Sequence, residues 1–303
     1  MRSMTSVLSA VTALGIGTLG YAAGVECRAY TLRRTEVPVL APGSRPLRVL
    51  HLSDVHMTPG QTGKQRWLRE LADVEPDLVV NTGDNLAHQD SVPVVLDAYR
   101  GLLDVPGVFV LGSNDYFAPV LKNPARYLLS NQKITTPDEV LPWRELRDSF
   151  TGRGWLDLTN RHGSLQVAGR RICFVGVDDP HLGYDDLAAV AGTADPGADL
   201  NIAVAHAPYL RLLDQWNREG YRLLMAGHTH GGQLRLPGFG ALVTNCDLDR
   251  ARARGLHRHR VDGHEPSWLH VSAGLGTSPL APVRFCCRPE ASLLTLVARR
   301  PDS

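Results

Sequence analysis

Residues 47–56 read Leu-Arg-Val-Leu-His-Leu-Ser-Asp-Val-His, an apolar run that ends in an Asp-x-His pattern. A short run rich in Leu and Val that is followed by polar residues predicts a buried strand. Runs of this kind alternate with longer amphipathic stretches along the chain, over 47–52, 64–74, 77–81, 92–103 and 108–111. This order of strand, helix, strand, helix, strand predicts an α/β fold.

The sequence predicts a hairpin followed by a strand at 172–177, and further apolar runs in the second half of the chain predict strands at 201–205, 223–226, 234–236, 268–272 and 293–297. We expect antiparallel pairing among them, because their connections look too short for crossover helices. Residues 117–150 form a polar, proline-punctuated insertion, and such an insertion after a strand commonly overhangs a site. We therefore expect one domain over 47–303, preceded by a linker or edge strand over 28–46.

The composition is that of a globular protein with balanced charge. Of 303 residues, 43% are apolar, and 32 Lys and Arg residues face 31 Asp and Glu residues. Such a chain has enough apolar residues for a sizeable core. Because the net charge is only +1, we expect no obligatory nucleic-acid partner, and no protein partner is predicted. The five cysteines form no Cys-x-x-Cys pair, so neither a structural zinc site nor a redox pair is predicted.

Residues 7–25 contain no charged side chain, and as a helix they are about long enough to cross a hydrocarbon core of roughly 30 Å. We therefore expect residues 1–27 to anchor the protein in the cytoplasmic membrane. A cleaved signal peptide and an interfacial helix are the alternatives, because Ala, Gly, Ser and Thr dilute the apolar residues. Arg28, Arg33 and Arg34 favour a cytoplasmic body, whereas Arg2 opposes it, so the side of the membrane stays open.

Side chains of types that bind metals follow directly after five of the predicted strands. In chain order these side chains are Asp54 and His56, Asp84, Asn114, His206, and His228 and His230. In an open α/β sheet the carboxyl ends of the strands meet at one crevice, where ligands bind. A mixture of carboxylate, amide oxygen and imidazole suits Mn, Fe or Zn better than Ca or Mg. The sequence therefore predicts one metal site, whereas His51, between two leucines, is interpreted as structural.

These five motifs resemble those of the calcineurin-like metallophosphoesterases, whose pattern is Asp-x-His, Gly-Asp, Gly-Asn-His-Asp/Glu, a lone His and Gly-His-x-His. All five occur here in the family's order. Within the family, the chain is most similar to the bacterial, N-terminally membrane-anchored group, through Gly-His-Thr-His-Gly-Gly-Gln at 227–233 and a tail over 274–290. The resemblance implies an α/β/β/α sandwich of two mixed sheets flanked by helices.

Carried onto this sequence, the resemblance implies two divalent metal ions, with Mn, Fe or Zn as the expected metals. One ion would be held by Asp54, His56, Asp84 and His230, and the other by Asp84, Asn114, His206 and His228. Asp84 would bridge the two. The resemblance also implies catalysis through Asp84, Asn114 and His228, with a hydroxide that bridges the metals as the nucleophile.

Residues 112–115 depart from the family pattern. They read Gly-Ser-Asn-Asp, so the motif His that assists the leaving group is absent. Asn114 is favoured over Ser113 as the ligand, because an amide oxygen is the better donor. The proton donor stays open. The candidates are His88, His162 and His181, and a metal-bound water or a good leaving group would serve instead.

We expect a phosphoesterase that hydrolyses a phosphomonoester or phosphodiester, on a membrane-linked or envelope-linked substrate if the anchor is real. A nuclease or cyclic-nucleotide phosphodiesterase is an alternative, which the basic stretch 250–260 would serve. The missing motif His motivates a second alternative, a metal-binding scaffold with weak or no turnover.

Overall fold

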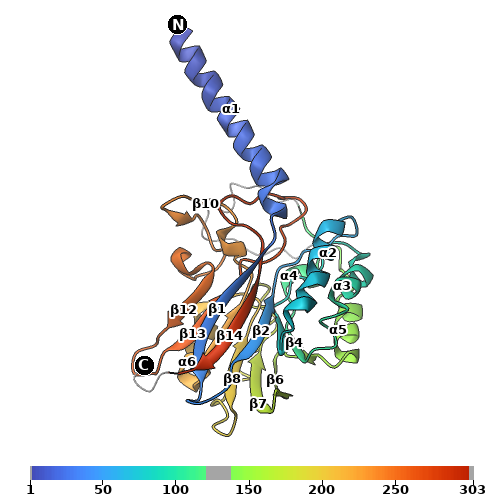
Figure 1. Ribbon diagram of the computed structural model, residues 1–303, viewed down its shortest axis with the longest axis vertical. Coiled ribbons are helices and arrows are strands. Elements are labelled where there is room, and N and C mark those ends of the chain that lie inside the picture. The colour runs from blue at the N-terminus through green and yellow to red at the C-terminus, as the bar shows by residue number, and fades with distance from the viewer. Residues whose placement is uncertain (1, 121–137, 300–303) are drawn as a thin grey trace.

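Two six-stranded sheets pack face to face in the computed structural model, which describes residues 2–120 and 138–299. Helices cover the outer faces of both sheets, and α1 (Arg2–Gly24) projects away from the body (Figure 1). This arrangement is an α/β/β/α sandwich of two mixed sheets, so the predicted fold class is confirmed.

The first sheet has the strand order β1 (Thr31–Leu40), β14 (Glu290–Ala298), β2 (Leu47–Leu52), β3 (Leu78–Asn81), β4 (Gly107–Phe109) and β5 (Leu156–Asp157). Strands β2 to β5 are parallel, β14 is antiparallel to β2, and β1 pairs in parallel with β14 at the edge. Helices α2 (Thr62–Glu70) and α3 (Ser91–Tyr99) connect the parallel strands. The predicted rhythm over 47–111 is therefore confirmed.

The second sheet has the order β12 (Gly255–His259), β13 (Ser267–Val271), β9 (Leu223–Ala226), β8 (Leu200–Val204), β7 (Arg170–Gly176) and β6 (Arg161–Val167). The expectation of antiparallel pairing is wrong for β8, β9 and β13, which are parallel, and β7 pairs in parallel with β8 as well. Helix α6 (Leu210–Glu219) makes the crossover between β8 and β9. The predicted strand 234–236 instead forms a small separate hairpin, β10 (Arg235–Leu236) with β11 (Gly240–Ala241).

Three apolar clusters hold the layers together. Between the sheets, Val49 and Val80 of the first sheet pack in one cluster with Ile202 and Met225 of the second. On the outer face of the first sheet, a separate cluster includes residues of α2, α3 and α5 (Trp143–Gly152), and α6 covers the second sheet. Both sheets are thus fixed on both faces, which makes the carboxyl ends of their strands a rigid platform.

The structure describes parts of two further segments, the expected insertion 117–150 and the N-terminal segment 1–27. Residues 121–137 of the expected insertion 117–150 lie outside the described residues, and the remainder includes α5 and an isolated bridge between Phe117 and Val140. In the part of the chain that the structure covers, no helix is both long enough and apolar enough to cross a membrane. The expectation of a membrane-spanning helix over 1–27 is therefore not confirmed, because small and hydroxylated residues dilute the apolar side chains of α1.

Candidate metal centre

The structure brings the seven predicted side chains to one end of the two sheets. Asp54 and His56 follow β2, Asp84 follows β3, and Asn114 lies in the short helix α4 (Ser113–Tyr116) after β4. From the second sheet, His206 follows β8, and His228 and His230 follow β9. All are buried except Asn114 and His230, and the side chain of His230 is 14% exposed.

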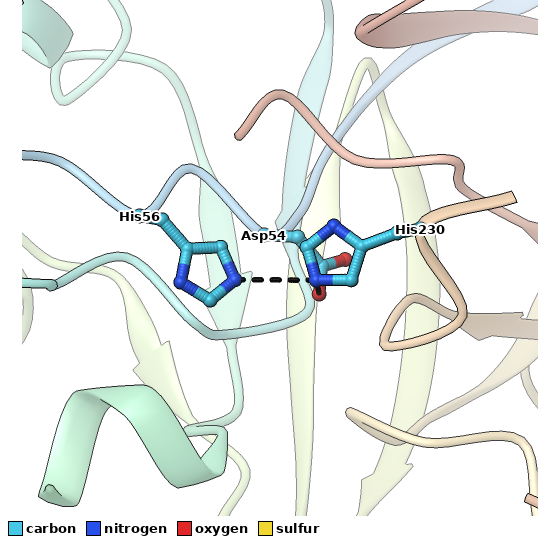
Figure 2. A group of neighbouring side chains, drawn as sticks. All are labelled: Asp54, His56 and His230. Carbon is cyan, nitrogen blue, oxygen red and sulfur yellow. Dashed lines mark hydrogen bonds and ion pairs between the residues drawn. The ribbon is translucent and has the colours of Figure 1, made fainter. Parts of the chain in front are cut away.

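The first group of these side chains consists of Asp54, His56 and His230 (Figure 2). The two Nε2 atoms of the histidines are 3.3 Å apart, and His230 Nε2 is 3.6 Å from Asp54 Oδ1. One ligand atom from each residue lies within 4.8 Å of the others. Such a spacing suits three ligands around one cation.

The second group is centred on Asp84. Its Oδ2 is 3.4 Å from His56 Nε2 and 3.5 Å from His206 Nε2, so it touches imidazoles from both sheets. His228 Nδ1 is 3.3 Å from His206 Nε2, and Asn114 donates both its backbone N–H and its amide N–H to the Asp84 carboxylate. Ligand atoms of Asp54, Asp84 and His206 also lie within 4.8 Å of one another, so Asp54 is within reach of both groups.

Backbone carbonyls fix three of the imidazole rings. The Nδ1 atoms of His206 and His230 lie 2.7 Å and 3.0 Å from the carbonyl oxygens of Thr82 and Gly276. His228 Nε2 lies 3.3 Å from the carbonyl oxygen of Asn245. A carbonyl oxygen accepts a hydrogen bond only from a nitrogen that carries a proton, so in the neutral form of each ring the other nitrogen presents a lone pair to the centre. Metal-ligating histidines are held by bonds of this kind.

The protonation states of the site follow from burial and from the charges around each group. Burial holds the pKa of His56 down to about 4, and it keeps the pKa values of His228 and His230 well below normal. Burial alone would raise the pKa of Asp84, but His206, His56 and the bonds from Asn114 lower it. The Asp84 carboxylate is therefore ionised beside the neutral rings of His56, His228 and His230. The carboxylates of Asp84, Asp54 and Asp179 outweigh burial at His206 and raise its pKa to about 9, so a bound cation would displace a proton from that ring.

His56 shows that this donor set fits a metal. Its Nδ1 is buried and has no hydrogen-bond partner, which is costly, and its Nε2 lies 3.3 Å from His230 Nε2 and 3.4 Å from Asp84 Oδ2. Two imidazole nitrogens and a carboxylate oxygen gathered at this spacing are ligands that divalent ions bind, so the residues present fit a bound divalent ion.

Five of these residues adopt a left-handed backbone conformation. They are Asp54, His56, Asp84, His228 and His230, with φ between 44° and 66°. Each such non-glycine residue costs on the order of 1–3 kcal/mol and persists where the surroundings fix it, often at functional sites. Here the Asp54 and His56 N–H groups donate to the carbonyls of Gly83 and Asp84, both at 2.9 Å.

Two glycines let the backbone pass close to the site. A Cβ at Gly112 would collide with Asp84 Oδ1 and lie 2.7 Å from the His206 ring, and a Cβ at Gly227 would collide with Ser53 and Asp54. No larger residue fits at either position without moving a carboxylate of the site. The sequence shows both glycines at strand exits, but their contacts could not be inferred from it.

Asp115 is a positioning residue whose role the sequence did not reveal. Its buried carboxylate accepts backbone N–H bonds from Asp84, Asn85, Leu86 and Gly112, at 2.7–3.2 Å. These bonds tie the Gly83–Asp84 turn to the turn that carries Asn114. Burial raises the pKa of Asp115 to about 6. The only signal in the sequence is its place directly after Asn114.

His51 is buried as predicted, and it belongs to a chain of hydrogen bonds that reaches Asp54. His51 Nδ1 is 2.8 Å from His270 Nδ1 on the second sheet, and His51 Nε2 is 3.0 Å from Thr82 Oγ1. The Thr82 hydroxyl donates to Ser53 Oγ at 2.6 Å, and the Ser53 hydroxyl donates to Asp54 Oδ2 at 2.5 Å. These hydrogen bonds fix the orientation of the Asp54 carboxylate on the side away from the other ligands.

Of the three candidate proton donors, His181 lies against the site. Its ring centroid is 4.5 Å from that of His228, and its Nδ1 is 3.1 Å from the Tyr209 hydroxyl. His88 is half-exposed beside Asp90, and His162 is exposed on β6. The neighbouring Asp179 is fully buried with one carboxylate oxygen unpartnered, and burial raises its pKa to about 7.

Comparison with known proteins gives a family match and more distant relatives. The sequence model described as calcineurin-like phosphoesterase matches residues 47–232, which include all seven side chains. The chain is 26% identical over 256 residues to the uncharacterized metallophosphoesterase YkoQ of Bacillus subtilis, covering 83% of this chain and 84% of that protein. It is 29% identical to the transmembrane protein with metallophosphoesterase domain of Bos taurus, covering 87% of this chain and 56% of that protein. The crystal structure of a 5'-nucleotidase precursor from Thermus thermophilus matches with a TM-score of 0.42 and 15% identity, covering 83% of this chain and 55% of that chain.

Proposed function

Because this chain belongs to the calcineurin-like phosphoesterase family, it is a metal-dependent phosphoester hydrolase, and we propose that it uses two divalent cations to hydrolyse a phosphomonoester or phosphodiester. The position of Asp84 carries this proposal. One oxygen of its carboxylate lies 3.4 Å from His56 Nε2 and 3.5 Å from His206 Nε2, between ligands that come from two different sheets.

The proposed ligands of one cation are Asp54, His56, Asp84 and His230, and those of the other are Asp84, Asn114, His206 and His228. The imidazoles and the ionised Asp84 carboxylate suit Mn, Fe or Zn. When bound, the cations would neutralise the phosphoryl oxygens and lower the pKa of the attacking water. The carbonyls of Thr82, Asn245 and Gly276 hold three of the imidazole rings oriented toward the metal positions. Little rearrangement of these side chains would therefore be needed when the cations bind.

We propose that His181 supplies the proton that the missing motif His would have given. Its ring packs beside His228, and the Tyr209 hydroxyl holds its Nδ1, so the ring is positioned rather than free. Proton donation by a positioned imidazole contributes about 10²- to 10⁴-fold to such reactions. A His181→Gln variant should lose most activity on an ester with a poor leaving group and little on p-nitrophenyl phosphate.

The nuclease alternative receives little support from the basic stretch 250–260. The Arg252 guanidinium lies 3.2 Å from His259 Nδ1, and His259 in turn contacts Asp214. The Arg258 guanidinium lies 4.2 Å from the centroid of the Trp268 ring. The contacts of Arg252 and His259 engage those two groups within the protein, so fewer of the basic groups remain for a phosphate backbone.

We also propose that α1 associates with the cytoplasmic membrane, as expected for the N-terminally anchored bacterial group. Leu14, Ile16 and Leu19 are 72%, 67% and 65% exposed, on a helix that projects from the body (Figure 1). Apolar side chains this exposed favour a bilayer over water. The Bos taurus relative is named as transmembrane, which supports the same proposal.

Counting metal ions in matched variants tests the two-cation proposal. Wild-type protein should retain about two ions per chain after dialysis, whereas His56→Ala and His206→Ala should each retain about one, since each removes a ligand of a different ion. Asp84→Asn should weaken both. A wild type that never holds more than one ion per chain, in any of Mn, Fe or Zn, would contradict the proposal.

A further inference from the structure

We infer that the body of the protein docks on a bilayer that contains anionic lipid, through a surface next to α1. This docking surface consists of the β10–β11 hairpin, residues 234–241, and the loop 277–286. The inference rests on the membrane association proposed above. It adds that the folded domain itself touches lipid and that the substrate is a phosphate ester carried by the membrane.

Exposed apolar side chains gather at this end of the molecule. Leu234, Leu236 and Phe239 on the hairpin are 41%, 48% and 60% exposed, and Leu280 on the loop is 46% exposed. Within the described residues there are twelve exposed large apolar side chains, and nine of them lie on α1, its end at Val25, or the docking surface. A concentration of this kind marks an interaction surface, because scattered single residues would need no explanation.

The docking surface is continuous with the base of α1. The Arg284 N–H donates to the carbonyl of Ala22 in α1 at 3.1 Å. On the other side, the N–H of Arg235 donates to the carbonyl of Phe285 at 2.9 Å, and the N–H of Phe285 donates to the carbonyl of Gln233 at 3.0 Å. Figure 1 shows β10 beside the base of α1, with β6 and β7 at the opposite end. A bilayer that holds α1 would therefore meet the hairpin and the loop as well.

The charges in these segments favour anionic lipid as the occupant. The sequence contains no Asp or Glu over 1–25, 231–246 or 275–289. The first acidic residue, Glu26, is buried and accepts the Cys287 N–H. Arg28 and Arg288 are exposed, and the Arg250 guanidinium lies 5.1 Å from the ring centroid of Phe239. Cations placed near an anionic bilayer strengthen its binding.

The docking surface leads directly to the metal centre. The hairpin begins a few residues after His230, and the loop begins next to Gly276, whose carbonyl accepts the His230 Nδ1–H. His230 is also the more exposed histidine of the first group, at 14% against 2% for His56. A phosphate ester at the headgroup level would approach the centre from this side, so a lipid-borne ester is the fitting substrate class.

Quenching by brominated lipids tests the docking surface in the full-length protein. A Phe239→Trp variant, bound to phosphatidylglycerol/phosphatidylcholine vesicles, should show quenching beyond that of the wild-type tryptophans. The matched control is Gln166→Trp, at an exposed site on β6, which should show none. Equal quenching in the two variants while both are bound to vesicles would overturn the inference.

A second comparison separates docking from chemistry. The double variant Leu236→Ser/Phe239→Ser should hydrolyse phosphatidic acid in vesicles about tenfold more slowly than the wild type does. Its hydrolysis of p-nitrophenyl phosphate should be unchanged. Val140→Ser, at an exposed apolar residue elsewhere, should change neither. If the wild-type protein hydrolysed neither the lipid ester nor p-nitrophenyl phosphate, the proposed phosphoesterase function itself would be wrong. A dimer that dissociates in the double variant, without lipid quenching, would assign the surface to a second copy and overturn the inference.

Discussion

His51 Nδ1 lies 2.8 Å from His270 Nδ1, in a buried contact that joins β2 of the first sheet to β13 of the second. Only one of two nitrogens this close carries a proton, so one ring donates to the other. Burial lowers the pKa of His270 to about 3, and burial with the nearby His270 holds the pKa of His51 well below normal. The pair therefore links stability to pH.

We predict that the pair makes the protein less stable in acid. In the unfolded chain both histidines take up protons below their usual pKa of about 6.5, whereas folding lowers the pKa of His270 to about 3 and holds that of His51 well below its usual value. The free energy of unfolding should fall over this range by up to about 1.4 kcal/mol per pH unit for each histidine. Urea unfolding from pH 7.5 to 5 should show a shallower dependence for His270→Gln, and an unchanged dependence would refute the assignment.

Interrupting the hydrogen-bond chain at Thr82 should weaken metal binding. Thr82→Val removes the hydroxyl that accepts from His51 and donates to Ser53, so Asp54 loses its support. Loss of such outer contacts typically costs 10- to 100-fold in metal affinity. Competition with a chromophoric chelator measures it. Thr82→Ser is the matched control and should bind like the wild type. Adding Ser53→Ala to Thr82→Val should cost little more, and full additivity would count against one connected chain.

Removing Asp84 or His228 should abolish hydrolysis and leave the fold largely intact. Asp84→Asn and His228→Ala each take away a ligand at the centre, and a loss of at least about 100-fold is expected. Circular dichroism should be unchanged, because the three apolar clusters hold the sheets independently of these side chains. Full activity in both variants would show that the site has been assigned to the wrong residues.

A methyl group at Gly112 should damage the centre more than the fold. Its Cβ would collide with Asp84 Oδ1 and lie against the His206 ring, so Gly112→Ala should bind metal at least about tenfold more weakly. Gly63→Ala is the control, since a Cβ in that part of α2 has open space within 4 Å, and it should be neutral or stabilising by up to about 1 kcal/mol. Metal titration of both variants checks this, and equal affinities would contradict it.

The sequence predicted the first half of the fold well because its helices and strands differ clearly in period and length. Residues 47–111 alternate between short apolar runs and amphipathic stretches, and β2, α2, β3, α3 and β4 follow that order. The seven ligand candidates were found for a related reason. Parallel strands present their carboxyl ends at one edge, so polar residues after each strand converge whatever the connections are.

The pairing of the second sheet could not be predicted in the same way. Helix α6 is only ten residues long, and the segment between β8 and β9 looked too short for a crossover. The roles of Asp115, Thr82 and His270 were also invisible, because each acts through a contact between distant parts of the chain. Such contacts are decided by packing and leave no periodic signal in the sequence.

The most direct test of the two-cation phosphoesterase is turnover measured together with metal content. The full-length protein would be stripped of metal, reloaded with Mn, Fe, Zn or Mg, and assayed on p-nitrophenyl phosphate and on its bis-ester. We predict turnover of at least one ester at about two bound ions per chain, and none in the stripped protein. Two bound ions with no turnover of either ester would contradict the account and favour a metal-binding scaffold.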